Sequence, residues 1–205
     1  MKFFKFFNKN DESQKTQFSN IESYLSQASL ETTTRLEELF NYPVTFSNFK
    51  VYKVELNELP LIIGKEDERT ISVFINVEDT LPGKLIFLVS DISGENILRQ
   101  LTGKDSVSLS DENGMLTEIS RGCIENVAQI FISTFVSALS NLMNKTIMLS
   151  VPMISFSFKY SIINEIIFEK AETSDIIELF SAKFSIKKEN IEGLFLFLPR
   201  DKING

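Results

Sequence analysis

An acid and a carboxamide stand four residues apart in the apolar segment 125–139, which reads ENVAQIFISTFVSAL: Glu125 and Gln129. Four residues is about one helical turn, so both side chains project from one side of a helix. A carboxamide accepts hydrogen bonds through its oxygen and donates them through its nitrogen, which suits it to orient water. The pair therefore has two interpretations: a working site, or the solvated face of a structural helix, where such spacing is common.

The composition removes most other catalytic sites. The chain has no histidine, so the commonest general base and metal ligand are absent, as are Ser-His and Cys-His nucleophile pairs. Cys123 is the single cysteine, so no intramolecular disulfide can form, and we expect a cytoplasmic protein. Because Arg121 is the only cation close to Cys123 in the sequence, we expect the Cys123 thiol to be buried and inert.

The charge pattern argues against nucleic acid. The net charge is −7 and no basic block stands out, so we expect no nucleic-acid partner. The acidic clusters at 66–68 (EDE) and 110–113 (SDEN) lack calcium-loop spacing, and no glycine-rich phosphate loop is present. We therefore expect no metal or cofactor of the chain's own.

The two halves of the chain repeat one pattern. Residues 79–91 (DTLPGKLIFLVSD) and 189–201 (ENIEGLFLFLPRD) both run from a turn through a glycine and an apolar run to an aspartate. Gly83 matches Gly193 in this alignment. Because a strand-like segment precedes each run, each half predicts a β-hairpin that turns near its glycine.

A second match lies upstream of the hairpins. Residues 35–46 (RLEELFNYPVTF) resemble residues 138–149 (ALSNLMNKTIML), and both read as helix ends that pass through an asparagine into a strand, at Asn41 and Asn144. Repeated order of this kind predicts a duplicated domain with approximate two-fold symmetry.

The predicted domain covers residues 19–205 and consists of repeats at about 19–104 and 115–205, joined by a surface loop at 101–114. No linker separates the repeats, so we expect them to share one core. Residues 1–18 are predicted to be a flexible tail. Their MKFFKFF start is too short for a membrane span, which leaves a mobile end or a docking peptide.

Apolar residues recur at three- and four-residue steps from Ile119 to Leu142, which predicts a long helix. Residues 29–40 predict a surface helix, and 161–180 predict a helix throughout. Combined with the hairpins, this favours an α+β fold in which antiparallel strands form a shared sheet with long helices packed on it.

With the repeat in view, the chain resembles the CheC family of chemotaxis phosphatases, and more loosely the middle domains of flagellar switch proteins. The resemblance rests on four segments in the same order, which together span both halves: residues 39–46 (LFNYPVTF), 81–89 (LPGKLIFLV), 137–152 (SALSNLMNKTIMLSVP) and 184–199 (FSIKKENIEGLFLFLP).

The resemblance implies a partner and a reaction. In that family an exposed helix presents Asp or Ser, then Glu four residues on, then Asn three further. The Glu engages a phosphorylated CheY-type response regulator, and the Asn orients water at its aspartyl phosphate. The phosphatase brings no metal, since magnesium is expected in the regulator. A CheD-type receptor deamidase is a second candidate partner.

This chain departs from the family motif. The same registration places Gly122 at the leading position, Asn126 at the Glu position and Gln129 at the Asn position. A glutamine supplies the same carboxamide with one more methylene, as in GTPases that position water with Gln. A shifted pair, Glu125 and Gln129, also has the spacing of the acid and Gln in the unrelated phosphatase CheZ.

The first half lacks both acid and amide at the matching places, where Ser19, Ser23 and Ser26 stand, and Glu22 lies one residue early. The first-half helix therefore resembles an inactive copy. Glu118 lies on the same side of its helix as the shifted pair, and we expect Glu118, Glu22 and Ser26 to contact the partner.

Three functions remain open at this point. The first is dephosphorylation of a CheY-type regulator in two-component chemotaxis and flagellar signalling, with Glu125 and Gln129 as catalytic residues. The second is a catalytically degenerate module that binds a regulator, a deamidase adaptor or the flagellar switch. The third is an unrelated α+β domain.

Overall fold

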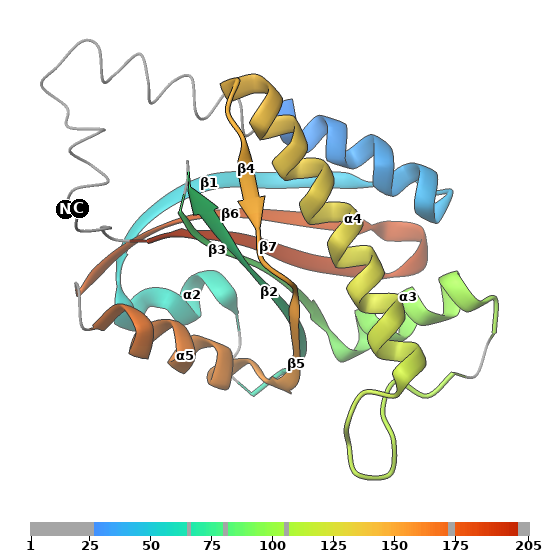
Figure 1. Cartoon of the computed structure of the whole chain (residues 1–205). Coiled ribbons are helices and arrows are strands. Elements are labelled where there is room, and N and C mark those ends of the chain that lie inside the picture. The colour runs from blue at the N-terminus through green and yellow to red at the C-terminus, as the bar shows by residue number, and fades with distance from the viewer. Residues whose placement is uncertain (1–26, 65–66, 80–81, 105–106, 172–174, 201–205) are drawn as a thin grey trace, which may run out of the picture.

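The computed structural model of the chain describes residues 27–64, 67–79, 82–104, 107–171 and 175–200 (Figure 1). The predicted tail at 1–18 lies outside these ranges. In chain order the elements are a helix over residues 27–40, β1 (Thr45–Glu55), the 3-10 turn η1 (Leu56–Glu58), α2 (Leu59–Ile63), β2 (Arg69–Asp79), β3 (Gly83–Ser90), α3 (Asp91–Thr102), α4 (Glu118–Met143), β4 (Ile147–Leu149), β5 (Met153–Phe158), α5 (Lys159–Ala171), β6 (Ile176–Ile186), the 3-10 turn η2 (Lys187–Glu189) and β7 (Ile191–Pro199).

One antiparallel sheet organises these elements. Its strand order is β1-β6-β7-β3-β2, and β2 pairs on its other side with both β4 and β5. The helix over residues 27–40, α3 and α4 pack on one face, and α2 and α5 pack on the other (Figure 1). The α+β fold predicted from the sequence is confirmed.

The sheet also confirms the duplication. β1 of the first half pairs with β6 of the second, and β4 and β5 of the second half pair with β2 of the first. The halves thus exchange edge strands and share one sheet. β3 and β7 meet at its centre, where Ile86 pairs with Leu196. The offset that relates Gly83 to Gly193 also relates Ile86 to Leu196. Because these two equivalent residues pair with each other, the pseudo-two-fold axis passes between them.

The equivalence extends to the ends of the helices. Asn41 and Asn144 both take the left-handed conformation that ends a helix, with φ of 56° and 51°. Their separation is 103 residues (144 − 41), and the same offset takes Lys50 of β1 to Met153 of β5. Both edges shift register at the same place: β1 between Ser47 and Lys50, and its counterpart between β4 and β5.

Two hydrophobic layers hold the sheet between the helices. The layer under α4 is rich in phenylalanine: the rings of Phe131 and Phe195 lie 4.8 Å apart between centroids, and those of Phe87 and Phe184 stack at 5.2 Å. The opposite layer is mainly aliphatic and joins α2 and α5 to the sheet. Close packing of this kind makes the core sensitive to added volume.

Gly83 and Gly193 occupy positions where a side chain would clash with an aromatic ring. A Cβ at Gly193 would lie 2.1 Å from the ring of Phe184, and a Cβ at Gly83 would lie 2.7 Å from the ring of Phe197. In each half, therefore, an aromatic ring crosses the strand at a position that only glycine leaves open. Both predicted hairpins are present, with the second turning at η2 rather than at Gly193 itself.

Three sequence predictions need correction. The helix predicted over 161–180 ends at Ala171, and β6 starts at Ile176, because this run pairs with β1 and β7 and buries side chains in the layers on both faces of the sheet. Ile119, where the predicted apolar period begins, is 57% exposed. The loop predicted at 101–114 begins inside α3 and buries Leu109.

Candidate functional site

Helix α4 carries the candidate residues, and local sequence sets its ends. The Oγ1 of Thr117 accepts a hydrogen bond from the backbone N–H of Ser120 at 3.1 Å, which caps the first turn. At the other end, the backbone N–H of Asn144 bonds to the carbonyls of Ser140 and Asn141. The helix has 26 residues. At the usual rise it is about 39 Å long and presents an extended outer face.

The outer face of α4 is a line of small and polar side chains at three- and four-residue steps. We call this line the α4 stripe, and it consists of Gly122, Asn126, Gln129, Ser133 and Ser137, all of which are exposed. The inner face buries apolar side chains that include Ile124, Phe131 and Phe135. By length and composition, α4 is the one helix in the described ranges that could cross a bilayer, and half of its apolar window is buried inside the molecule.

Gln129 lies at the centre of the α4 stripe. Its side chain is exposed and makes no hydrogen bond to any residue that the structure describes. The carboxamide is therefore available to a ligand or partner, with one acceptor oxygen and two donor hydrogens.

Glu125 sits beside the stripe and has a partner already. The Nη1 of Arg121 lies 3.8 Å from its Oε1, and the Glu125 side chain is 35% exposed. An exposed helical ion pair at this spacing contributes about 0.3–0.5 kcal/mol, so it restrains Glu125 only weakly. The spacing of four residues between Arg121 and Glu125 makes this contact readable from the sequence, although it was not predicted.

Asn126 and Gly122 extend the stripe toward the start of the helix. Asn126 is exposed and reaches solvent one turn before Gln129. A Cβ placed on Gly122 would meet nothing within 4 Å, so the fold described here gives no steric reason for glycine. Glu118 is exposed in the first turn, where the helix dipole favours negative charge.

The two partner contacts expected in the first half, Glu22 and Ser26, lie outside the described residues. The helix over residues 27–40 presents Leu30, which is 68% exposed, and an Arg35–Glu38 ion pair at 3.0 Å. This outer face differs from the α4 stripe, so the two halves do not offer the same chemistry.

The remaining reactive groups have structural explanations. Cys123 is half-buried, and burial raises the pKa of its thiol above the ordinary value, which keeps the thiol protonated. The carboxylate of Asp111 accepts bonds from the backbone N–H groups of Asn113 and Met115, both at 2.9 Å, so this acid closes its own loop. Glu68 pairs with Lys159. Within the described ranges, no group of three or more His, Cys, Asp or Glu residues is placed to hold a metal ion.

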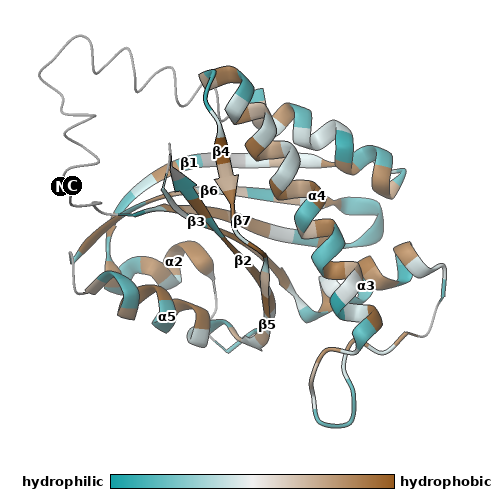
Figure 2. Ribbon diagram, viewed as in Figure 1, coloured by the Kyte–Doolittle hydropathy of each residue, from teal (hydrophilic) through white to brown (hydrophobic). Residues whose placement is uncertain are grey.

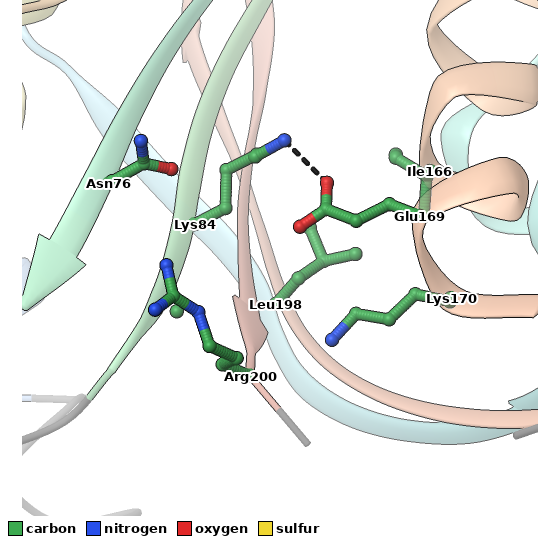
Figure 3. Close-up of a pocket in the computed structure, with 8 residues that line it drawn as sticks. Asn76, Lys84, Ile166, Glu169, Lys170, Leu198 and Arg200 are labelled. Carbon is green, nitrogen blue, oxygen red and sulfur yellow. Dashed lines mark hydrogen bonds and ion pairs between the residues drawn. The ribbon is translucent and has the colours of Figure 1, made fainter. Parts of the chain in front are cut away.

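Two hollows lie at equivalent places in the halves, on the side of the sheet that carries α2 and α5. The smaller one has about 10 Å³, room for about one water. Figure 3 shows the Lys84 ammonium pointing at the Glu169 carboxylate. The Lys84 Nζ and the Glu169 Oε2 lie 2.5 Å apart, and the Lys170 Nζ donates to the carbonyl of Pro199 at 2.6 Å. These contacts leave the hollow mostly filled.

The larger hollow, about 530 Å³, arises because α2 stops at Gly64 whereas its counterpart α5 continues beyond Ile166. The buried hydroxyls on its walls are already bonded: Ser93 accepts from the N–H of Glu192 at 3.0 Å, and Thr70 donates to the carbonyl of Glu68. Among the described residues that line the two hollows, no hydroxyl is hydrogen-bonded to a carboxylate or an amine side chain.

Known proteins were found to share this chain's fold, although sequence similarity to them is low. No family model matches the chain. The curated CheY-P phosphatase CheC of Bacillus subtilis is 22% identical over 122 residues, and the match spans 60% of this chain and 57% of that relative.

Solved structures match over more of the chain. Thermotoga maritima FliY superposes with a TM-score of 0.65 at 13% identity and 88% coverage of both chains. The middle domain of FliM from Vibrio alginolyticus superposes at 0.55 with 12% identity, covering 86% of this chain and 93% of that one. A chain of the Borrelia burgdorferi complex of CheX with CheY, BeF3 and Mg²⁺ superposes at 0.54 with 14% identity, covering 87% of this chain and 98% of that one. The chain has the fold shared by CheC, CheX, FliY and the FliM middle domain.

Proposed function

We propose that this protein binds a phosphorylated CheY-type response regulator through the α4 stripe and promotes hydrolysis of its aspartyl phosphate. The observation that carries the proposal is the exposed, uncommitted carboxamide of Gln129 on a long outer helix of a CheC-like fold. The name of the Bacillus subtilis relative and the CheX–CheY complex support a regulator as the partner.

The reaction needs little from this chain beyond positioning. A water oxygen forms a bond to phosphorus while the bond from phosphorus to the aspartyl oxygen breaks, which leaves a free carboxylate and inorganic phosphate. The regulator's magnesium offsets the negative charge of the phosphoryl oxygens. The Gln129 oxygen accepts a hydrogen bond from the attacking water and holds it in line, since an amide is too weakly basic to remove the proton.

Glu125 has a different role in this proposal. It anchors the helix to a cation or a backbone N–H of the regulator and gives up Arg121 when it does so. The ion pair is worth about 0.3–0.5 kcal/mol, so this exchange costs only about a factor of two in affinity. Glu118 extends the same acidic edge by one to two turns.

A binding module without catalysis is the second candidate function, and a specific observation favours it. The position of the family's Glu holds Asn126, which is exposed and neutral, while the nearest acid is paired with Arg121. Such a module would hold the regulator, or a CheD-type deamidase, without turning over phosphate.

Phosphate release separates the two functions. A CheY-type regulator is phosphorylated with acetyl phosphate and Mg²⁺, and its phosphate loss is followed with and without this protein. We expect faster loss, and we expect Gln129→Ala to remove most of that acceleration, by about 10²-fold or 2.7 kcal/mol. Asn57→Ala, which removes an exposed carboxamide from η1 rather than from α4, is the matched control and should keep full activity.

Binding is measured on the same variants with the regulator held in its BeF3 and Mg²⁺ form. Equal affinity of the parent and Gln129→Ala, combined with lost turnover, places Gln129 in the chemistry. Binding without any acceleration supports the module instead. Asn126→Glu then restores the family's acid, and increased turnover in that variant would show that only this position had been lost. Activity unchanged in Gln129→Ala refutes the assignment of the carboxamide.

A further inference from the structure

The two hollows on the α2 and α5 side of the sheet are one site repeated in the two halves. The offset of 110 residues (193 − 83) relates residues that line the smaller hollow to residues that line the larger one: Gly83 to Gly193, Lys84 to Leu194, and Leu198 to Leu88. Asn76 lies opposite Lys84 in the β2–β3 pairing. Lys183 lies opposite Leu194 in the β6–β7 pairing, so Lys183 is the counterpart of Asn76.

The last turns of α5 fill the smaller hollow. There the Nζ of Lys84 lies 3.6 Å from Glu165 and 2.5 Å from Glu169, and both acids belong to α5 (Figure 3). The larger hollow has no such filling. The offset of 103 residues makes Ile63, the last residue of α2, the counterpart of Ile166, and α5 continues for five residues beyond that point (171 − 166). Five residues make about 1.4 turns of helix.

The space that α2 leaves open has the size of the missing helix. At a diameter of about 10 Å and a pitch of 5.4 Å, 1.4 turns of helix occupy about 600 Å³. The larger hollow has about 530 Å³. Two residues that line it are apolar and face solvent: Leu61 is 84% exposed and Ile92 is 59% exposed. Figure 2 shows α2 mainly in brown. An apolar side chain between Leu61 and Ile92 would remove both from water.

The charges around the larger hollow indicate which helix fits it. Lys183 is exposed and makes no hydrogen bond or ion pair with any residue that the structure describes. Glu68 and Lys159 pair with each other, so together they add no net charge. Glu192 is exposed on the neighbouring strand β7 and disfavours an occupant that is acidic throughout. The walls therefore complement a helix with one carboxylate for Lys183 and a basic residue beside it.

We propose that the larger hollow binds an amphipathic helix of another protein, in the place that the last turns of α5 take in the other half. This helix covers Leu61 and Ile92 with apolar side chains and pairs a carboxylate with Lys183. Residues 169–170 of α5, Glu-Lys, have the same order of charges. The hollow and α4 lie on opposite faces of the sheet, so this helix and a partner on the α4 stripe can bind together and independently.

A peptide of residues 159–171 (KYSIINEIIFEKA) with blocked ends is the probe, because α5 fills the equivalent hollow. Fluorescence polarisation follows binding of the labelled peptide to the full chain. We expect saturable binding, and we expect Lys183→Glu to weaken it about tenfold, since the reversal replaces an attraction by a repulsion. Lys145→Glu makes the same change in net charge at an exposed lysine just beyond α4 and should bind the peptide as the parent does. A peptide with Glu165→Lys and Glu169→Lys should bind the Lys183→Glu chain more tightly than the Lys145→Glu chain.

Amide NMR shifts of the full chain locate the peptide. We expect changes at Leu61, Ile92 and Lys183 and none along the α4 stripe. The proposal is overturned if no binding saturates at about millimolar peptide, if the Lys183→Glu and Lys145→Glu chains bind equally, or if the shifts centre elsewhere.

Two other occupants give different signals without any peptide. A second copy would change the shifts around Lys183 as the protein concentration rises. The chain's own N-terminal segment would change them at every concentration when Phe6→Asp and Phe7→Asp are introduced together. Either result would overturn the assignment of the hollow to a helix of another protein.

Discussion

Gly193→Ala is expected to destabilise the fold because its methyl group has no space. The new Cβ would lie 2.1 and 2.3 Å from two ring carbons of Phe184 and 2.8 Å from the carbonyl oxygen of Leu88. Phe184 is 1% exposed and is held against Phe87 and Phe131, so its ring cannot swing away freely.

The expected size follows from opposing effects. Overpacking a tight core costs up to about 3 kcal/mol, while alanine recovers about 0.5–1 kcal/mol of backbone entropy relative to glycine. The net loss is about 2 kcal/mol. For a chain of this size, that lowers Tm by about 4–8 °C. Urea unfolding followed by far-UV circular dichroism measures the same loss as a lower midpoint at unchanged slope.

A double-mutant cycle isolates the ring as the cause. Phe184→Ala removes the ring. In that background Gly193→Ala should cost about 1 kcal/mol less than in the parent chain, because residues in contact are coupled at about this magnitude. The contact with the Leu88 carbonyl remains in both backgrounds. A loss under about 0.5 kcal/mol in the parent chain, or an equal loss in both backgrounds, would refute the packing argument.

Other substitutions test the remaining inferences. Gly122→Ala should stabilise by about 0.5–1 kcal/mol in the same urea assay, because its Cβ meets nothing within 4 Å and alanine favours the helix. Thr117→Ala should lower the free energy of unfolding by about 1 kcal/mol because it removes the cap of α4, whereas Thr117→Ser should largely keep that stability. Burial raises the pKa of Cys123, so the thiol should react with iodoacetamide more slowly in the folded chain than in urea. Because the thiol's pKa is higher in the folded chain than in the unfolded chain, its contribution to stability is complete below the unfolded-state pKa and is lost as pH rises through the folded-state pKa. Cys123→Ser should remove this decrease in the free energy of unfolding at alkaline pH.

Part of the candidate site was readable from residue spacing. The helical period put Gln129 on the side away from the apolar stripe, and the structure exposes it. Spacing allows the ion pair of Glu125 with Arg121, but it could not show that Glu125 would be half-buried, because burial depends on how deeply the helix settles onto the sheet. The open space at Gly122 was equally hidden, since a glycine is consistent with both a crowded and an empty position.

The sequence alone determined the duplication, the α+β class and the helix ends at Asn41 and Asn144, because turn chemistry and hydrophobic period are local properties of the chain. Only the tertiary structure decided that the halves exchange edge strands and that the run after Ala171 is a strand. Those features depend on contacts between residues far apart in sequence: a short apolar run takes whichever conformation buries its side chains, and its partner strand settles the outcome.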